Sequence, residues 1–333
     1  MAKATIDDVA ALAGVSIKTV SRVVNSEPNV RAATREKVQK AIDKLGYHPS
    51  QSARSLASNR SFLVALLYDN PSASYVIDVQ NGILAECRPA GYDLLIHPCD
   101  HADPELEQQV VSLVRQSRVD GVVLTPPLSD HENLVRRLME LHISVVVIAP
   151  AQDAIPCSSV MTNDEEAAFA MTSRLLEKGH RRIGYILGHP DHKAMANRYQ
   201  GYQKALMYQG IPVEKRLVVQ GMNSFESGYY AAEKLLLSAN PPSAIFASND
   251  DMAAGAIKLA HKLGKKIPSD VAIAGFDDIP AAEQLWPGLT TVRQPIVEMA
   301  RQAAQLMLMQ LRSSEPVVQH QRVKSTLIQR ESV

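Results

Sequence analysis

Residues 5–25 read TIDDVAALAGVSIKTVSRVVN, and this stretch decides how the N-terminal part of the chain folds. Thr5 and Asp8 have the spacing of a capping box, in which each side chain satisfies a backbone donor of the first helical turn. Gly14 suits a position just past a helix end, where the chain turns through a left-handed conformation. Ser16 can then cap a second helix. Two short helices joined by a glycine turn predict a helix-turn-helix, whose second helix enters the major groove of DNA.

Apolar residues recur at helical spacing in these two helices and in a third one predicted over 29–45. They are Val9, Leu12, Ala13, Val20, Val23, Val24, Val38, Ala41, Ile42 and Leu45. The spacing predicts a three-helix head over residues 1–46, although a generic pair of amphipathic helices would give a similar pattern. Residues 47–61 contain too few apolar side chains to fold alone, so we expect a linker that orders on a partner.

The distribution of charge supports a nucleic-acid partner although the whole chain is formally neutral. Residues 1–60 carry ten Lys and Arg against five Asp and Glu, and the remaining residues carry 25 against 30. A basic head on an acidic body is the asymmetry expected when only the head meets phosphate.

The segments AGVSIKTVSRVVN (13–25), TREKV (34–38), LGYHPS (45–50) and ARSLA (53–57) together resemble the lactose-repressor (LacI/GalR) family of transcription regulators. Later motifs extend the resemblance over essentially the whole chain. The resemblance implies that residues 47–61 form a hinge helix on operator DNA, with Leu56 inserted as an apolar wedge into the minor groove. The predicted DNA-binding residues are Thr5, Ser16, Ile17, Lys18, Thr19, Ser21, Arg22, Asn25, Asn29, Thr34, Tyr47, Ala53 and Leu56.

From residue 62 the pattern changes to short apolar runs that alternate with amphipathic segments. The runs predict strands over 62–68, 92–97, 119–124, 144–149, 182–187, 216–220, 243–248 and 271–276. Helices are predicted over 75–89, 104–117, 130–141, 164–178, 194–209, 226–238, 251–263 and 296–312. Such alternation indicates parallel βαβ units with right-handed crossovers. We expect two doubly wound α/β lobes, similar to periplasmic sugar-binding proteins, behind an all-α head.

The last 44 residues are too few for a third lobe, so we expect them to return to both existing ones. The predicted first lobe comprises residues 62–161 and 291–320, and the second comprises 162–290 and 321–333. A chain that passes repeatedly between two lobes forms a hinge around a ligand cleft.

Ligands of open α/β sheets bind at the carboxyl ends of the strands. The resemblance places a ligand clamp at Arg198 of the RYQG motif, an amide at Asn249 and a carboxylate at Asp277. Arg, Asn and Asp side chains together suit the hydroxyl groups of a sugar. The full predicted effector set is Asp69, Tyr75, Thr125, Arg198, Asn249, Asp277 and Trp286.

Four of these residues also have a purely structural interpretation. Asp69 and Asp277 can cap a following helix, Arg198 can form a salt bridge across the lobes, and Trp286 can belong to a core or an interface. The chain also departs from several relatives by having Ala149 where they end the fourth strand with Asp.

Other site classes receive less support from the sequence. His97, His101, His189 and His192 suggest a metal, but they lie in separate predicted lobes without a Cys or Glu to complete a site. The three cysteines are widely spaced and form no CxxC pair, which favours idle thiols. We find no Walker loop, G-x-S-x-G or strand-following GxGxxG, so no enzyme and no cofactor are expected. The N-terminus lacks a signal-peptide core and no apolar run is long enough to span a membrane, so a cytoplasmic location is expected.

We therefore predict a dimeric, sequence-specific transcriptional regulator that binds a pseudo-palindromic operator. The most direct interpretation of the sequence is a repressor of carbohydrate-use genes, and a small sugar in the cleft would control its binding to the operator. The alternatives are a non-sugar effector, such as a purine or nucleoside, or a sugar-binding module with an enzymatic activity.

Overall fold

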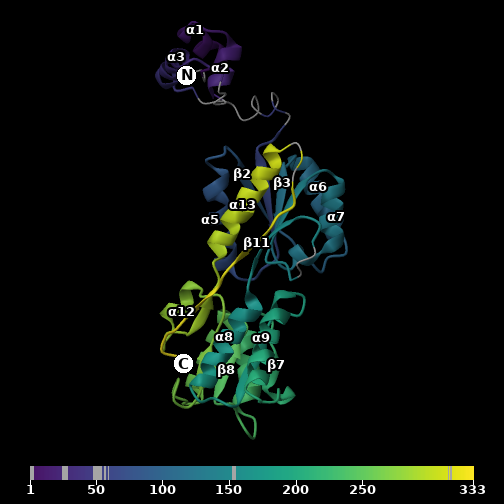
Figure 1. Cartoon of the computed structure of the whole chain (residues 1–333), viewed down its shortest axis with the longest axis vertical. Coiled ribbons are helices and arrows are strands. Elements are labelled where there is room, and N and C mark those ends of the chain that lie inside the picture. The colour runs from purple at the N-terminus through teal and green to yellow at the C-terminus, as the bar shows by residue number, and fades with distance from the viewer. Residues whose placement is uncertain are drawn as a thin grey trace. The chain divides into compact units, whose positions relative to one another are not determined.

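The computed structural model describes residues 4–24, 29–47, 55, 58, 60–151, 155–313, 315 and 317–333. It divides into two compact units, residues 1–62 and 63–333 (Figure 1). Three predicted DNA contacts, Asn25, Ala53 and Leu56, lie outside the described residues, as does most of the predicted hinge helix.

The described part of the head contains the three predicted helices: α1 (Ile6–Ala13), α2 (Ile17–Val24) and α3 (Ala32–Leu45). Thr5 and Asp8 form the predicted capping box, and Gly14 and Gly46 end α1 and α3 in the left-handed conformation. The buried core comprises Val9, Ala10, Val20, Val23, Val38, Ala41 and Tyr47. Leu12 was predicted to belong to this core but is 45% exposed, so this part of the prediction is wrong.

The first lobe of the larger unit is built on a six-stranded parallel sheet in the order β11-β5-β4-β3-β1-β2. Its strands are β1 (Leu63–Tyr68), β2 (Asp93–Pro98), β3 (Gly121–Leu124), β4 (Ser144–Ile148), β5 (Ser158–Thr162) and β11 (His320–Val323). Its helices are α5 (Ala73–Cys87), α6 (Leu106–Ser117), α7 (Glu132–Glu140), α13 (Ile296–Arg312) and the short η1 (Leu128–Asp130). Helices α5 and α13 pack side by side on the sheet (Figure 1).

The second lobe contains a four-stranded parallel sheet in the order β7-β6-β8-β9 and an antiparallel β10-β12 pair. Its strands are β6 (Ile183–Leu187), β7 (Val218–Gln220), β8 (Ala244–Ala247), β9 (Ala272–Ala274), β10 (Thr291–Arg293) and β12 (Thr326–Ile328). Its helices are α8 (Asp164–Glu177), α9 (Ala194–Tyr208), α10 (Phe225–Leu236), α11 (Asp250–Lys262), α12 (Pro280–Gln284) and the short η2 (Lys215–Leu217).

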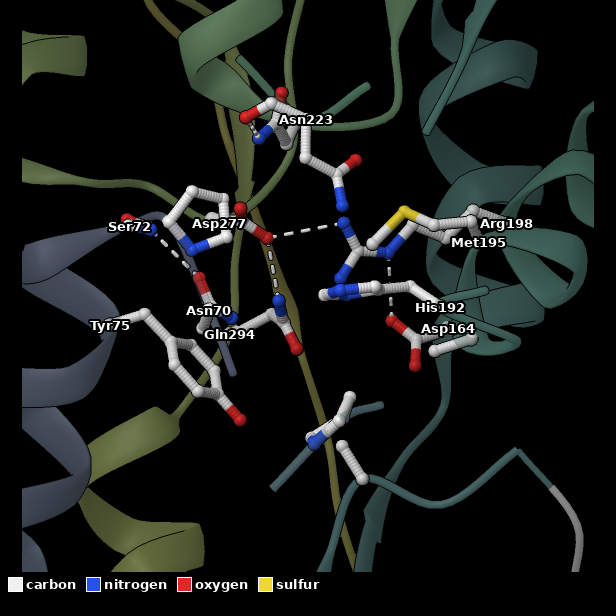
Figure 2. Close-up of a pocket in the computed structure, with 15 residues that line it drawn as sticks. Asn70, Ser72, Tyr75, Asp164, His192, Met195, Arg198, Asn223, Asp277 and Gln294 are labelled. Carbon is white, nitrogen blue, oxygen red and sulfur yellow. Dashed lines mark hydrogen bonds and ion pairs between the residues drawn. The ribbon is translucent and has the colours of Figure 1, made fainter. Parts of the chain in front are cut away.

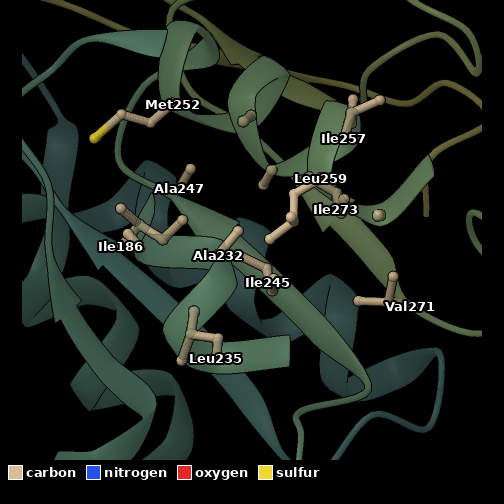
Figure 3. Packing of buried hydrophobic residues seen from close by; sticks show 14 of the residues in the cluster. Ile186, Ala232, Leu235, Ile245, Ala247, Met252, Ile257, Leu259, Val271 and Ile273 are labelled. Carbon is tan, nitrogen blue, oxygen red and sulfur yellow. The ribbon is translucent and has the colours of Figure 1, made fainter. Parts of the chain in front are cut away.

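Helices α10 and α11 of the second lobe pack closely against each other and against the sheet. Aliphatic side chains from β6, β8 and β9 pack against α10 and α11, and Figure 3 labels Ile186, Ala232, Leu235, Ile245, Ala247, Met252, Ile257, Leu259, Val271 and Ile273. Gly228 of α10 lies against the backbone of Met252, where an added Cβ would come within 2.2 Å of the carbonyl oxygen. A larger residue at Gly228 would therefore separate α10 from α11.

The chain crosses between the lobes after β5, after β10 and after β11. Two of the lobe boundaries therefore differ from those predicted from the sequence. Strand β10 pairs with β12 in the second lobe, so the chain returns to the first lobe after 293 rather than at 291. Strand β11 pairs with β5 in the first lobe, so the final crossing follows 323 rather than 320.

Strand β5 was missed at the sequence level because its sequence, SSVMT, lacks a continuous apolar run. All five residues are buried. The polar ones find partners: Ser158 Oγ accepts from the Gln310 side chain at 2.7 Å, and Ser159 Oγ bonds His320 Nδ1 at 2.8 Å. Satisfied hydroxyl groups can be buried at little cost, so the strand does not need apolar residues throughout.

Candidate functional site

The head presents a shallow hollow between α2 and the start of α3. It is lined by Val15, Ser16, Thr19, Arg22, Asn29, Val30, Arg31 and Thr34. Five of the predicted DNA contacts, Ser16, Thr19, Arg22, Asn29 and Thr34, thus gather on one surface. Ile17 and Lys18 are exposed at the beginning of α2, beside this hollow. The arrangement offers hydroxyl, amide and guanidinium groups together, which suits base edges and phosphates.

Arg31 also lines this surface and was missed. A signal was available in the sequence, because a cation just before a helix start is disfavoured by the helix dipole. Arg31 occupies the N-cap of α3 without a side-chain capping bond. Its position therefore suggests a role in meeting an anion.

Two predicted contacts are placed differently. Tyr47 is only 7% exposed and packs in the head core, so its ring has a structural role rather than the DNA-facing position predicted. Thr5 is exposed but its hydroxyl bonds Asp8 Oδ2 at 2.7 Å, which commits the side chain to capping α1.

In the larger unit, a cleft between the two lobes encloses an empty space of about 580 Å³, part of it open to solvent. The first lobe contributes Asn70, Pro71, Ser72, Tyr75, Pro126 and Ala149. The second lobe contributes Asp164, His192, Ala194, Met195, Arg198, Asn223, Asn249 and Asp277, and Gln294 comes from a crossing segment. Most of these residues follow strand ends, where open α/β sheets bind ligands.

Arg198 occupies the centre of the charged side of this cleft (Figure 2). Its guanidinium contacts Asp164 at 3.3 Å, Asp277 at 3.2 Å and the carbonyl of Ser248, and it stacks 3.8 Å from the centre of the Phe276 ring. Burial alone would lower the pKa of Arg198, but Asp277 and Asp164 outweigh it and raise that pKa. Both partners belong to the second lobe, so the ion pairs do not cross between lobes.

Asp277 faces the cleft and does not cap a helix. Helix α12 begins later, with Ile279 at its N-cap and no side-chain capping bond. The carboxylate of Asp277 accepts from Gln294 Nε2 at 2.6 Å as well as from Arg198. Burial raises its pKa to about 6. Its φ of 116° is unusual for a non-glycine residue, and such strain is often found at functional sites.

Tyr75 brings an unsatisfied polar atom to the other side of the cleft. Its hydroxyl is buried and has no hydrogen-bond partner within the described part of the chain. Burial raises the pKa of this hydroxyl, so it remains neutral. Buried hydroxyls are almost always hydrogen-bonded, which makes Tyr75 a candidate partner for a bound ligand.

Asn249 lines the cleft, but its amide is already engaged. Its Oδ1 accepts from the backbone of Met252 at 2.9 Å and caps α11, and its Nδ2 donates to the carbonyl of Asn223 at 3.0 Å. Asn223, His192 and Gln294 are lining residues that the sequence reasoning did not include in the effector set. Asn223 follows a short strand in a polar loop, which was the available signal.

Three predicted effector contacts do not line the cleft. Asp69 turns away and bonds His101, while the adjacent Asn70 lines the cleft instead. Thr125 is 1% exposed beneath the surface, and Pro126 takes its place. Trp286 follows α12, which carries it away from the cleft, and it is 84% exposed.

Comparison with known proteins gives matches to both parts of the chain. Residues 5–50 match the family of bacterial regulatory proteins, lacI family, and residues 172–333 match the periplasmic binding protein-like domain. The chain is 34% identical over 333 residues to the HTH-type transcriptional repressor PurR of Erwinia tasmaniensis, which covers 99% of this chain and 97% of the relative. The chain belongs to the lacI family.

Two solved structures resemble this lacI-family regulator over almost its full length. The transcriptional regulator CelR in complex with cellobiose shares 30% identity with a TM-score of 0.76, over 99% of this chain and 100% of that one. The lac repressor dimer bound to operator and the anti-inducer ONPF shares 25% identity with a TM-score of 0.82, over 99% of each chain.

These similarities confirm the predicted family, the two-lobed α/β fold with a helix-turn-helix head, and the function of a DNA-binding transcriptional regulator. Among the described helices of this lacI-family protein, none has both the length and the apolar composition that crossing a membrane requires.

Proposed function

We propose that this regulator binds a pseudo-palindromic operator as a homodimer and that a small sugar in the interlobe cleft controls its affinity for DNA. The observation that carries the sugar assignment is the composition of the cleft. It combines the Arg198–Asp277 pair, the amides of Asn70, Asn223 and Gln294, and the buried hydroxyl of Tyr75. Such a set of donors and acceptors suits a ligand with several hydroxyl groups.

The small number of aromatic side chains in the lining favours a sugar over a flat heterocycle. Among the described residues that line the cleft, Tyr75 is the only Phe, Tyr or Trp, and side chains such as Met195 and Ala149 add further apolar contact. One aromatic ring can cover one face of a pyranose, whereas a planar base is commonly held by stacking. The complex of the similar CelR with cellobiose adds support for a sugar.

A purine or nucleoside is the second candidate, supported by the 34% identity to the PurR repressor. An enzymatic activity is not proposed, because the relatives named above are transcriptional regulators.

The assembly and the location follow from the same function. Two heads are needed to contact the two halves of a pseudo-palindrome, and the similar lac repressor binds operator as a dimer. Promoter DNA lies in the bacterial cytoplasm, so we place the regulator there. We further propose that a hinge links the two lobes. The DNA-binding residues described above would contact the operator, and the cleft residues would contact the effector.

The effector acts by linkage between the cleft and the head. If it changes operator affinity by some factor, operator DNA changes effector affinity by the same factor. Crossing segments at Gln294 and Ser325 join the lobes, and Ser325 donates its backbone N–H to Asn163 Oδ1 at 2.8 Å on a neighbouring crossing. Movement of one lobe against the other would be transmitted through these segments.

Thermal unfolding of the full chain tests the effector class. A panel of mono- and disaccharides is compared with purines and nucleosides, because a ligand that binds only the folded state raises the melting temperature. We expect at least one sugar to raise it and to change operator affinity. A shift produced only by purines would replace the sugar assignment with the second candidate.

A further inference from the structure

Two histidine-containing loops from different lobes meet near the effector cleft. His101 follows β2 in the first lobe, and His189 and Asp191 follow β6 in the second. The Nε2 atom of His101 lies 3.0 Å from Oδ2 of Asp191, and the rings of His101 and His189 have centroids 5.9 Å apart. No metal was expected from the sequence, because these histidines lie in separate lobes without a Cys or Glu to complete a site. The fold nevertheless brings them together, and Asp191 adds a carboxylate.

Asp69 fixes the orientation of His101. Its Oδ2 atom lies 2.5 Å from His101 Nδ1 and also accepts the backbone N–H of His101 at 2.9 Å. A carboxylate in this position holds the imidazole proton on Nδ1 and leaves the lone pair of Nε2 available, as the outer carboxylates of metal-binding histidines do. The ordered His101 ring is therefore presented toward Asp191.

A positive charge is needed between His101 Nε2 and Asp191 Oδ2. With the Nδ1 proton held by Asp69, a neutral imidazole would point a lone pair at a carboxylate oxygen only 3.0 Å away. Either a second proton or a metal ion relieves this repulsion. The third group favours the metal, because His189 Nδ1 lies 3.8 Å from the same Asp191 oxygen. This nitrogen accepts the backbone N–H of Asp191 at 3.3 Å and would exchange that long hydrogen bond for a bond to the metal.

We propose that His101, His189 and Asp191 bind a divalent transition-metal ion, with zinc as the favoured ion, and that this ion links the two lobes. One donor atom from each residue lies within 4.8 Å of the other two. Ligand bonds of about 2.0–2.1 Å in a tetrahedron place donor atoms about 3.3 Å apart, and the distances of 3.0 and 3.8 Å fall on either side of that value.

The chemistry of the donors supports zinc in particular. Two imidazoles and one carboxylate match three-ligand zinc sites, which keep a fourth position for water. The Asp191 side chain is 58% exposed and that of His101 is 24% exposed, so an ion and its water can enter from solvent. The neighbouring group of Asp69, Asp100 and His101 has a single nitrogen and lies in one lobe, which makes it a poorer zinc site.

A metal at this position would be coupled to the effector. His192 belongs to the same loop as His189 and Asp191 and lines the cleft. An ion that joins the lobes stabilises their present arrangement. If the effector stabilises the same arrangement, it raises the affinity of the protein for the metal, and the metal raises the affinity for the effector by the same factor. The coupling depends on the proposed effector function, whereas metal binding itself does not.

Calorimetric titration of the chelator-treated full chain with Zn²⁺ tests the site. We expect one ion per chain, with affinity lowered more than tenfold in both His101→Ala and Asp191→Asn. Asp69→Asn should lower it by about 10- to 100-fold, as loss of an outer carboxylate usually does. The matched control is His261→Ala, which removes an exposed histidine of α11 and should leave the affinity unchanged.

Because Asp191 is exposed, Asp191→Asn should fold normally and keep the test decisive. Two results would overturn the proposal: no Zn²⁺ binding by the unmutated chain, or equal affinity for Zn²⁺ in the unmutated chain and in Asp191→Asn. Either result would mean that a proton, and not a metal ion, lies between His101 and Asp191.

A cysteine thiolate is the competing ligand, since Cys99 lies two residues before His101. Binding of Co²⁺ distinguishes the two, because thiolate ligation adds an intense near-ultraviolet charge-transfer band. We expect a spectrum without that band, and unchanged metal affinity in Cys99→Ser. A thiolate band that disappears in Cys99→Ser would assign the metal to the cysteine and refute the proposed site.

Discussion

Arg198 and Asp277 form an ion pair with a separation of 3.2 Å, although 79 positions separate them in the chain. Asp164 makes a second contact with the same guanidinium, and the side chains of Arg198 and Asp164 are 4% and 8% exposed. The cleft therefore holds a preformed network in which one guanidinium is shared by two carboxylates before any ligand arrives. Because Arg198 lines the cleft and also pairs with these buried carboxylates, effector binding and the stability of the second lobe depend on the same side chain.

Arg198→Ala should accordingly destabilise the protein as well as weaken effector binding. The substitution leaves Asp164 and Asp277 without their cation, and breaking a buried pair in this way costs about 3–5 kcal/mol. Denaturant unfolding of the full chain measures this cost. Arg137→Ala is the control, because its pair with Glu140 is exposed and should contribute only about 0–1 kcal/mol. Equal stability of the two variants would show that the network is dispensable.

Asp277→Asn should change how stability depends on pH. Burial raises the pKa of Asp277 to about 6 in the folded protein, whereas an unfolded Asp has a pKa of about 3.9. The folded state thus binds the proton more tightly, so this stabilisation is complete below pH 4 and is lost as pH rises through about 6. Relative to Asp277→Asn, the unmutated protein should lose on the order of 3 kcal/mol of unfolding free energy over that interval. Parallel pH profiles of the two proteins would contradict the raised pKa.

The sequence predicted much of this architecture because its signals were local. Capping at Thr5 and Asp8, and the glycine at Gly14, appear in the structure as predicted. The side chains of the cleft were harder to place, because a one-residue difference at a strand end reverses the direction of a side chain. Asp69 and Asn70 show this directly, since the first faces His101 and the second faces the cleft.

Contacts between residues far apart in the chain could not be predicted from local sequence patterns. The engagement of Asn249 by Asn223 depends on two loops that meet only in the folded lobe. The contact between His101 and Asp191 depends likewise on how the lobes come together. Neither the periodicity nor the spacing of residues carries that information.

Lys18→Ala should lower operator affinity and relax base preference at one symmetric position of the operator. Lys18 is exposed at the start of α2, where a recognition helix meets guanine edges. The expected discrimination is about 1–3 kcal/mol. Binding to operator variants with each base at that position measures it. A uniform loss for all sequences would make Lys18 a phosphate contact instead.

Affinity for DNA should fall steeply with salt, because the Lys and Arg residues of the head displace condensed counterions. Residues 63–333 form a separate compact unit that carries more acidic than basic residues. Fluorescence anisotropy with labelled operator should therefore detect binding by the full chain and none by that fragment. Retention of DNA by the fragment would contradict the division of roles between the two units.

Tyr75→Phe should have opposite effects on the free protein and on its complex with effector. The Tyr75 hydroxyl is buried without a partner in the described structure, so removing it relieves a desolvation cost and should leave the free protein as stable or slightly more stable. If the effector supplies the missing partner, the variant loses that hydrogen bond and binds more weakly by about 0.5–1.5 kcal/mol. Tyr202→Phe is the matched control, because its hydroxyl donates to the carbonyl of Ile183 at 2.8 Å in the lobe core. That variant should be less stable yet bind effector normally. Melting temperatures and effector titrations on both variants separate the two roles, and unchanged effector affinity in Tyr75→Phe would remove the hydroxyl from the recognition site.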